Sequence, residues 1–354
     1  MTTAEIPTTM RAARFDAATR RLAVEDVPVP APGPGEVLVE VAACGICLSD
    51  VHLLDGTLPG PLPVVTPGHE AAGTVAVLGE GVRGWTVGDR VVLAGGRPCS
   101  RCTMCVRGRV QECDAFEIMG FSYDGAWAQY VLSSSVGMSA VPDDLALERA
   151  CVLADAVATP YAALTDRAQL KPGESIALWG IGGLGVHAVQ TARLVGACPI
   201  IAIDPSAAAR ERALRLGADH ALDPTAVDVV AEVRRLTGGR GVDVAVDLVG
   251  ANAVLQQGAD CLARFGRVVM VGLSLDPIEL GIGVFFGLQS QSLLGHLGYQ
   301  RRHLDDLVTL VSAGRLDISG SVSGLLPLED VADGVEQLTS KRGDPIRLVV
   351  QPWT

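Results

Sequence analysis

The sequence is poor in lysine, in aromatic residues and in long apolar segments. Lysine occurs only at Lys171 and Lys341, and Phe, Trp and Tyr together make up 4% of the 354 residues. The net charge is −12, which excludes nucleic acid or an anionic membrane as the main partner. No run of about 18 apolar residues is present, so a membrane-spanning helix is excluded. The first twenty residues lack the apolar core of a secretory signal, and we expect a cytoplasmic protein with reduced thiols.

The abundant residues indicate a well-packed chain with more than one domain. Hydrophobic residues make up 49% of the sequence and glycine occupies 41 positions. A chain of 354 residues exceeds what one hydrophobic core usually organises, so two domains are expected. Up to about residue 150 the pattern predicts short strands, for example at 37–42, 73–77 and 90–93, separated by Gly- and Pro-rich turns.

From about residue 170 onward, apolar strands alternate with amphipathic helices. The predicted strands are 175–179, 200–203, 242–248 and 267–271, and the predicted helices are 184–195, 207–216, 227–236 and 253–263. Fully apolar strands that alternate with helices indicate an α/β domain, in which a parallel sheet is covered on both faces.

This alternation weakens after about residue 294. Two helices and one strand follow, at 303–313, 328–340 and 346–350. We therefore predict a first domain over 1–155, an α/β domain over 156–293, and a return of the chain to the first domain over 294–354.

Four cysteines lie within one short polar loop over 95–115, at Cys99, Cys102, Cys105 and Cys113. Their spacing suits four thiolates around one Zn²⁺ and strains disulfide bonds. The loop has little apolar bulk, so we expect a bound metal to organise it. Because a closed four-thiolate site has no open coordination position, the predicted zinc is structural and the chemistry lies elsewhere.

A glycine-rich turn follows the predicted strand 175–179 and opens a predicted helix. The turn contains Gly180, Gly182, Gly183, Leu184 and Gly185. Its glycines permit a tight turn and a close approach of a pyrophosphate, and the helix N-terminus offers free N–H groups to the phosphates.

Asp204 ends the next predicted strand, 19 residues after the last glycine of this turn. A carboxylate at that place accepts hydrogen bonds from an adenosine ribose and repels a 2′-phosphate. The motif therefore predicts a dinucleotide site that prefers NAD to NADP.

A second metal site is suggested by Cys47, His69 and Glu70. One Cys, one His and a further anion, with water in the fourth position, is typical of a catalytic zinc. Each residue also has an ordinary interpretation, because an isolated Cys is usually a small buried apolar residue and an isolated His a structural hydrogen-bonding group. Spacing alone does not decide between the two.

Four motifs occur in a fixed order: Cys-Leu-Ser-Asp-Val-His at 47–52, Gly-His-Glu at 68–70, the four-cysteine loop, and the glycine-rich turn at 180–185. Together, and over nearly the whole chain, they resemble the zinc-dependent alcohol dehydrogenases of the medium-chain dehydrogenase/reductase family. The resemblance implies a GroES-like β-barrel catalytic domain and a Rossmann domain with a doubly wound parallel sheet. It also implies a homo-oligomer, either a homodimer or a homotetramer.

The resemblance also implies a ligand set for the catalytic zinc. Cys47 and His69 match two ligands, and Glu70 matches a nearby carboxylate, so two Zn²⁺ per chain are expected. The third ligand in the family is often a Cys, but here Asp155 occupies the matching position. A carboxylate is a competent zinc ligand. Cys151, four residues earlier, is the alternative.

Roles for five further residues come from the same resemblance. Ser49 and His52 are expected to carry the released proton, by way of the nicotinamide ribose. Thr159 and the backbone of Leu273 are expected near the nicotinamide. Arg347 resembles a late arginine that reaches the cofactor phosphates, and the alternative is a surface arginine on a strand.

The implied reaction is the reversible oxidation of an alcohol to an aldehyde or ketone, in which hydride passes to NAD. The implied partner is a small-molecule alcohol or carbonyl compound. A reductase that acts on an activated C=C bond uses the same fold and cofactor, and it stays open as an alternative. The apolar candidates for a substrate pocket are Leu58, Phe116, Trp127, Phe285 and Phe286.

Overall fold

The structure is a computed structural model that describes residues 6–281 and 283–354. It divides into two compact units. Unit 1 comprises Met1–Ala158 and Gln300–Thr354, and unit 2 comprises Thr159–Tyr299. The predicted boundaries at 155/156 and 293/294 lie three and six residues from these divisions. The C-terminal segment Gln300–Thr354 belongs to unit 1.

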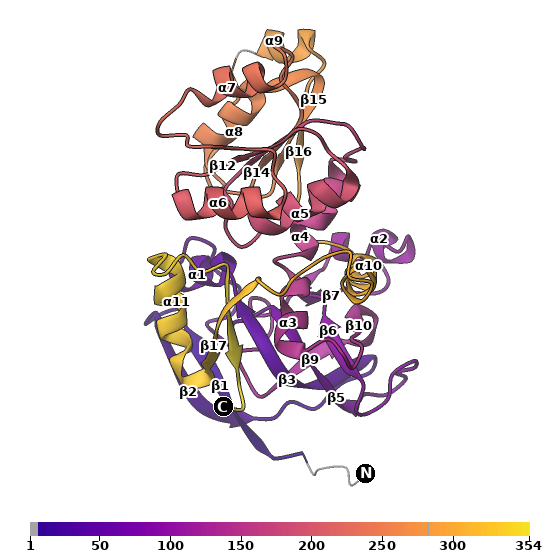
Figure 1. Cartoon of the computed structure of the whole chain (residues 1–354). Coiled ribbons are helices and arrows are strands. Elements are labelled where there is room, and N and C mark those ends of the chain that lie inside the picture. Colours follow the sequence, from indigo (N-terminus) through magenta and orange to yellow (C-terminus); the bar gives the residue numbers. More distant parts are fainter. Residues whose placement is uncertain (1–5, 282) are drawn as a thin grey trace. The chain divides into compact units, whose positions relative to one another are not determined.

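In its described residues, unit 1 contains two larger, mainly antiparallel sheets and a two-stranded sheet of β7 (Gly96–Arg97) and β8 (Glu117–Ile118) (Figure 1). The smaller sheet has the order β2-β1-β4, with β1 at Thr9–Asp16, β2 at Arg21–Pro28 and β4 at Val64–Val65. The larger sheet has the order β10-β6-β5-β3-β18-β17, and β9 pairs with β3. Its strands are β3 (Glu36–Ile46), β5 (Glu70–Leu78), β6 (Arg90–Leu93), β9 (Tyr130–Ser134), β10 (Met138–Ala140), β17 (Val322–Pro327) and β18 (Arg347–Gln351).

The three strands predicted in this region are confirmed as parts of β3, β5 and β6. Strand β3 is longer than predicted and is buried on both faces. Val37 and Val39 join the main core cluster, whereas Leu38 points into a second cluster, as the two-residue period of a strand requires. Strand β3 therefore lies at the centre of the unit, and the functional residues that follow it are held on a rigid base.

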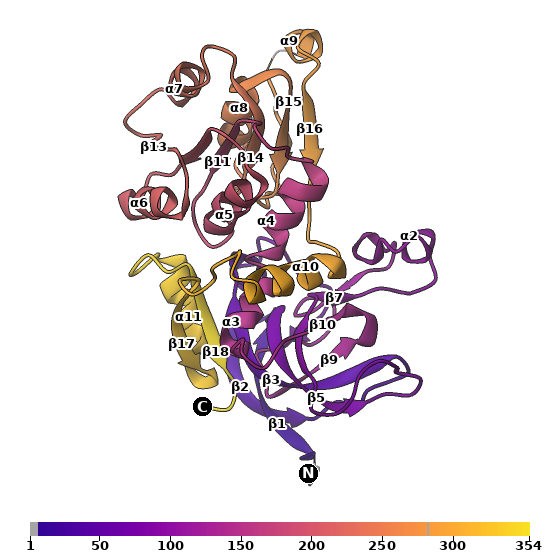
Figure 2. The same cartoon turned by 45° about the vertical axis from the view of Figure 1, so that its right-hand side comes forward.

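The C-terminal segment completes the larger sheet. β18 pairs antiparallel with β3 and parallel with β17, and Figure 2 shows the yellow C-terminal strands beside the indigo N-terminal ones. Two helices flank this return, α10 at Arg301–Ser312 and α11 at Val331–Thr339. This pairing brings residues near position 347 next to residues near position 46.

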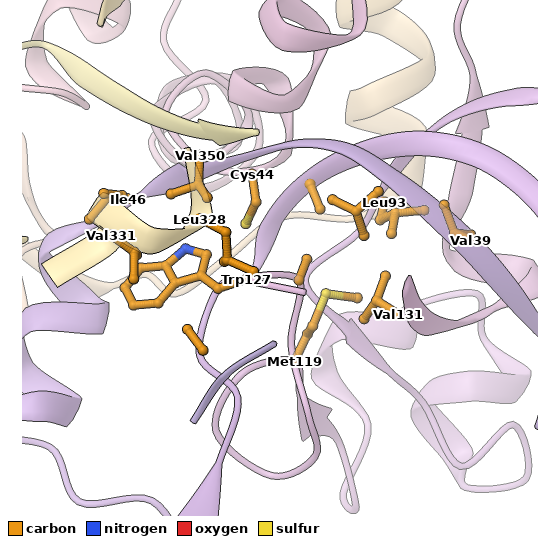
Figure 3. Packing of buried hydrophobic residues seen from close by; sticks show 14 of the residues in the cluster. Val39, Cys44, Ile46, Leu93, Met119, Trp127, Val131, Leu328, Val331 and Val350 are labelled. Atoms are coloured by element: carbon orange, nitrogen blue, oxygen red, sulfur yellow. The ribbon is translucent and has the colours of Figure 1, made fainter. Parts of the chain in front are cut away.

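The main core of unit 1 surrounds Trp127. Figure 3 shows its indole beside Leu328 and Val331, and the side chain is 0% exposed. The proposal that Trp127 lines a substrate pocket is therefore wrong, because the ring is enclosed by the core. Its Nε1 donates to the carbonyl of Gly45 at 3.5 Å, so its one polar atom has a partner.

Unit 2 contains one six-stranded parallel sheet with the order β13-β12-β11-β14-β15-β16. Its strands are β11 (Ile176–Trp179), β12 (Ile200–Ile203), β13 (His220–Leu222), β14 (Val242–Asp247), β15 (Leu262–Met270) and β16 (Ser292–Gly295). Its helices are α5 (Gly185–Val195), α6 (Ala207–Leu216), α7 (Val229–Leu236), α8 (Asn252–Asp260) and α9 (Gly283–Leu288), and α4 spans Ala158–Ala162.

The strand order reverses at β11, which identifies the doubly wound arrangement. The chain proceeds from β11 to β12 and β13, and then continues on the other side of β11 with β14, β15 and β16. Right-handed crossovers then place α5 and α6 on one face and α7 and α8 on the other, as Figures 1 and 2 show. Ligands of such sheets bind at this switch point, outside the carboxyl ends of the strands.

One predicted helix in unit 2 is too long. The prediction extended it to residue 263, but α8 ends at Asp260 and β15 begins at Leu262. The apolar residues of this stretch fit both a helical and a strand period. They form a strand because β15 pairs with β14, where Leu262 is opposite Val242. In the described ranges, no helix is long and apolar enough to cross a membrane.

Candidate functional site

A short helix positions the first candidate ligand. Helix α1 (Leu48–Leu54) starts directly after β3, and Cys47 is its N-cap residue. Asp50 closes the first turn, because its Oδ2 accepts from the Cys47 backbone N–H at 2.9 Å. The thiol of Cys47 is 4% exposed, so both backbone and side chain are held in a buried setting.

A glycine turn delivers the second candidate. His69 follows Gly68, whose φ of +94° belongs to the left-handed region. A Cβ at Gly68 would lie 2.5 Å from Trp127 Cδ1 and 2.9 Å from Cys44 Sγ, so only glycine fits there. Trp127 and Cys44 therefore pack closely against the backbone at Gly68, and this packing positions the next residue, His69. Cys44 is part of the main core cluster and acts in packing.

The structure brings Cys47, His69 and Asp155 together. One ligand atom from each lies within 4.8 Å of the others. Asp155 follows a short 3-10 turn at Cys151–Ala154, and its Oδ2 is 3.9 Å from His69 Nε2. A thiolate, an imidazole and a carboxylate form a donor set that fits Zn²⁺ and leaves a fourth position for a substrate oxygen. The alternative ligand Cys151 is not in this group; its thiol donates to the carbonyl of Glu148 at 3.4 Å.

Asp50 is the organising residue that the sequence analysis did not single out. Its side chain is 0% exposed, and its Oδ1 lies 3.2 Å from His69 Nδ1 and accepts from the Gly68 N–H at 3.3 Å. A carboxylate on Nδ1 orients the ring and leaves Nε2 free to coordinate a metal. Asp50 also raises the pKa of His69 well above its ordinary value, although burial acts in the opposite direction. The available signal was its place three residues after Cys47, where an acidic residue caps the helix.

Glu70 and Arg347 form a buried ion pair beside the three ligands. Arg347 Nε lies 2.9 Å from Glu70 Oε2, off the line of a hydrogen bond, and Arg347 Nη2 donates to Asp155 Oδ2 at 3.1 Å. The other Glu70 oxygen accepts from the Ala156 N–H at 3.0 Å. Burial acts to raise the pKa of Glu70, while the charge of Arg347 acts to lower it. Arg347 is 2% exposed and is not a surface residue; its contact with the cofactor phosphates stays a prediction.

The two predicted relay residues lie on α1. Ser49 is half-buried, and its Oγ is 3.6 Å from Cys47 Sγ. One turn later, His52 is also half-buried, with its Nδ1 3.9 Å from Asp55 Oδ2. Both side chains therefore lie on the helix that carries the first ligand, and their role in proton transfer stays a prediction.

The four-cysteine loop brings its sulfurs together as predicted. One sulfur from each of Cys99, Cys102, Cys105 and Cys113 lies within 4.8 Å of the others, and Cys102 and Cys105 are 3.6 Å apart. Backbone N–H groups point at these sulfurs, such as that of Cys99 at 3.2 Å from Cys113 Sγ. Hydrogen bonds from backbone N–H groups, that of Cys105 first, lower the pKa of the Cys102 thiol. The donor set fits a closed tetrahedral Zn²⁺ site.

The glycine-rich turn in unit 2 connects β11 to α5. Gly180 has a φ of +85°, and its N–H donates to the carbonyl of Ile203 at 3.0 Å. A Cβ at Gly185 would lie 2.0 Å from Gly180 O, whereas a Cβ at Gly182 would meet nothing within 4 Å. Gly185 is therefore required by the protein itself, and Gly182 borders open space. That space, at the N-terminus of α5, is where a pyrophosphate fits.

Asp204 ties the turn to the next loop. Its Oδ2 accepts from the Ile181 N–H at 2.7 Å and its Oδ1 from the Ser206 N–H at 2.8 Å. Thr159 is 7% exposed, and its carbonyl is 3.1 Å from His296 Nε2. Leu273 is exposed after β15, and a Cβ added at Gly250 would lie 2.4 Å from its carbonyl oxygen. The predicted contacts of these residues with a cofactor stay predictions.

Comparisons with known proteins agree with both units. The model of the alcohol dehydrogenase GroES-like domain matches residues 33–143, and the model of zinc-binding dehydrogenases matches residues 183–313. The chain is 32% identical to a sorbitol dehydrogenase of Bacillus subtilis, over 98% of each protein. It is also 32% identical to an NAD-dependent alcohol dehydrogenase of Sulfurisphaera tokodaii, over 93% of this chain and 96% of that protein.

Solved structures are similar over nearly the whole chain. The alcohol dehydrogenase of Aeropyrum pernix has a TM-score of 0.89 at 33% identity, covering 97% of this chain and 100% of that one. The alcohol dehydrogenase TADH of Thermus sp. ATN1 has a TM-score of 0.89 at 31% identity, covering 97% and 99%. The predicted combination of a GroES-like domain and a Rossmann domain is confirmed. The chain belongs to the zinc-type alcohol dehydrogenases of the medium-chain dehydrogenase/reductase family.

Proposed function

We propose that this protein interconverts an alcohol and the corresponding aldehyde or ketone, with NAD(H) as hydride carrier. The observation that carries the proposal is the convergence of Cys47, His69 and Asp155, three ligand atoms within 4.8 Å in a member of this family. When bound, a zinc ion supplies a Lewis acid that favours the ionised alcohol, and NAD supplies the hydride acceptor.

The chain's own residues hold this site in place. Asp50 fixes the His69 ring, and Arg347 holds Asp155 by an ion pair. Because Arg347 also pairs with Glu70, one buried guanidinium serves two carboxylates. Buried charges of this kind are stable only when they are paired, so the loss of any one partner leaves another uncompensated.

Oxidation of an alcohol releases a proton, and α1 supplies the groups to carry it. The Ser49 hydroxyl both accepts and donates a hydrogen bond, so it takes the proton from the substrate oxygen and passes it on. His52, one turn later on the same helix, would exchange this proton with solvent, because an imidazole ring nitrogen can either accept or donate a proton. The half-buried state of both residues supports this route.

In unit 2 the glycine turn binds the pyrophosphate, because Gly182 borders open space at the N-terminus of α5. Asp204 accepts hydrogen bonds from the adenosine ribose, and its negative charge favours NAD over NADP. Thr159 and the backbone of Leu273 contact the nicotinamide.

A reductase of activated C=C bonds is the weaker interpretation. The relatives and solved structures reported above are named as alcohol or sorbitol dehydrogenases, which supports carbonyl chemistry. Assays of a simple enone beside alcohols separate the two reactions.

We further propose two Zn²⁺ per chain and a homo-oligomer, a dimer or a tetramer. Exposed apolar side chains in unit 2 support self-association: Ile278, Val284, Phe285 and Leu288 are 50 to 64% exposed. All nine cysteines are free thiols, which favours a reducing compartment such as the cytoplasm. Light scattering on the purified protein measures the assembly.

The test of the function is a panel of primary, secondary and polyhydric alcohols, followed by NADH absorbance at defined metal content. We expect activity that disappears when the catalytic metal is removed and returns with Zn²⁺. Ser49→Ala is expected to lower kcat by roughly 10²- to 10⁴-fold and to leave NADH binding unchanged. Absence of turnover for every alcohol and carbonyl in a fully metallated protein that binds NADH contradicts the proposal.

A further inference from the structure

Two carboxylates lie together at the edge of the sheet where the dinucleotide is proposed to bind. Asp204 follows β12, Asp223 follows β13, and these strands are parallel neighbours, with Ile203 opposite Leu222. The Asp204 N–H donates to the carbonyl of Leu222 at 3.2 Å. Because the carboxyl ends of parallel strands meet at one edge, both side chains belong to the region that an adenosine ribose occupies.

An arginine lies between these two carboxylates. Arg210 is on α6, the helix that connects β12 to β13, and its side chain folds back toward the strand ends. Its Nη1 donates to the carbonyls of Asp204 and Pro205, each at 2.8 Å, and its Nη2 is 3.0 Å from Asp223 Oδ2. The side chains of Arg210 and Asp223 are 20% and 24% exposed, so this ion pair is mostly shielded from water.

Asp223 is itself held in place. Its Oδ1 accepts from the backbone N–H of Thr225 at 2.9 Å and from the Thr225 hydroxyl at 2.6 Å. These hydrogen bonds, the hydroxyl one first, lower the pKa of Asp223, with a smaller contribution from Arg210. Asp223 is therefore ionised at neutral pH, and its second oxygen stays aimed at Arg210.

A second arginine reaches the same region from the other side. Arg212 Nη2 donates to the carbonyl of Ile181, in the glycine turn, at 3.2 Å. Two guanidinium groups and two carboxylates therefore flank the loop after β12, and their formal charges cancel. A 2′-phosphate carries about two negative charges and needs an arginine that is free to bind it.

We propose that the Asp223–Arg210 ion pair is a second determinant of the preference for NAD, alongside Asp204. The inference rests on the proposed NAD site. Asp204 repels a 2′-phosphate directly. Asp223 acts indirectly, because it binds Arg210, the arginine that would otherwise bind such a phosphate. Replacing Asp204 alone leaves Arg210 held by Asp223. Replacing both removes the ion pair at Nη2 of Arg210, while Nη1 keeps its two backbone carbonyls, and leaves two arginines beside a site without a carboxylate.

The test is direct binding of NADH and NADPH by titration calorimetry to the zinc-loaded protein, so no alcohol turnover is needed. The proteins compared are the wild type, Asp204→Ser, Asp223→Asn and the double variant. We expect the ratio of the NADPH Kd to the NADH Kd to fall roughly tenfold in Asp204→Ser and roughly tenfold further in the double variant. Addition of Arg210→Met to the double variant is expected to abolish the second step.

Glu211→Gln is the matched control, because Glu211 is an exposed neighbour on α6 and loses the same charge. We expect it to leave the ratio unchanged when combined with Asp204→Ser. The inference is wrong if Asp223→Asn adds no NADPH binding to Asp204→Ser in a protein whose thermal melt is unchanged. It is also wrong if the triple variant keeps the gain, or if Glu211→Gln reproduces it. A wild-type protein that binds neither nucleotide contradicts the proposed function itself, which is a different result.

Discussion

In the glycine-rich turn of unit 2, replacement of glycine by alanine is expected to destabilise the protein at Gly185 and to weaken NADH binding at Gly182. In Gly185→Ala the new Cβ lies 2.0 Å from Gly180 O and 2.9 Å from Gly180 C. Normal contact between carbon and oxygen needs more than 3 Å, so the carbonyl has to move by about 1 Å. The Gly180 carbonyl has little freedom to move, because the backbone of Gly180 is in the left-handed region and its N–H donates a hydrogen bond to the carbonyl of Ile203.

The expected cost follows from this geometry. Overpacking of a rigid site costs about 1–3 kcal/mol, and alanine in a helix returns up to about 1 kcal/mol relative to glycine. We therefore expect Gly185→Ala to lose about 2 kcal/mol, which lowers the Tm of a domain of this size by roughly 4–8 °C.

Gly182→Ala is expected to behave in the opposite way. Its Cβ meets nothing within 4 Å, so the protein accommodates it without strain and the Tm stays the same or rises slightly. The methyl group fills the space proposed for the pyrophosphate, and we expect the NADH Kd to rise at least roughly tenfold.

Thermal melts by circular dichroism and NADH titrations measure both effects on the same samples. A Gly185→Ala protein that melts like the wild type would show that the turn relaxes at no cost. A Gly182→Ala protein that binds NADH like the wild type would show that the nucleotide does not approach this turn. Either result refutes the corresponding half of the reasoning.

Three further predictions concern other parts of the chain. Asp155→Ala is expected to reduce the metal content from two ions to one per chain, measured by elemental analysis; two ions in the variant would mean that Asp155 is not a ligand. Trp127→Ala removes the largest fully buried side chain and should cost about 3–5 kcal/mol in thermal or denaturant unfolding, with a loss below about 1 kcal/mol contradicting its core role. Burial acts to raise the pKa of Glu174, but hydrogen bonds from Arg267, at 2.6 Å, outweigh it and lower that pKa. The stabilisation by this pair is present above the unfolded pKa, about 4.3, and disappears as pH falls through the lower folded value. Glu174→Gln should therefore cost roughly 1–2 kcal/mol at pH 7 and less below about pH 4, and an equal loss at both pH values would contradict the ion pair.

The local parts of both candidate sites could be predicted because their residues are close together in the sequence. The four cysteines lie within one loop, so the conformation of that loop is enough to bring their sulfurs together. The same holds for the glycine turn, where each glycine stands one or two residues from the next. Helix α6 and strand β12 were also predicted with the bounds that they have, because their apolar periods are clear.

The arrangement around Arg347 was beyond sequence reasoning. Arg347 and Glu70 are 277 positions apart, and they meet because β18 pairs with β3, which also pairs with β5. Neither residue stands in a local pattern that indicates a buried ion pair, and a surface arginine on a strand was the alternative interpretation of Arg347.

The contacts of Asp50 and Asp223 also depend on the tertiary structure, although their partners are closer in the sequence. Asp50 stands in a recognised motif, yet its contact with His69 depends on how the Gly68 turn enters the core beside Trp127. Asp223 meets Arg210 only because β12 and β13 are adjacent in the sheet.

The sequence by itself determined which residues are candidates for metal and nucleotide binding, since ligand spacing, glycine turns and apolar periods are properties of a few neighbouring residues. Only the tertiary structure decided which charges surround those residues. Strand order and register bring distant side chains within 3 Å of one another, and periodicity along the chain specifies neither.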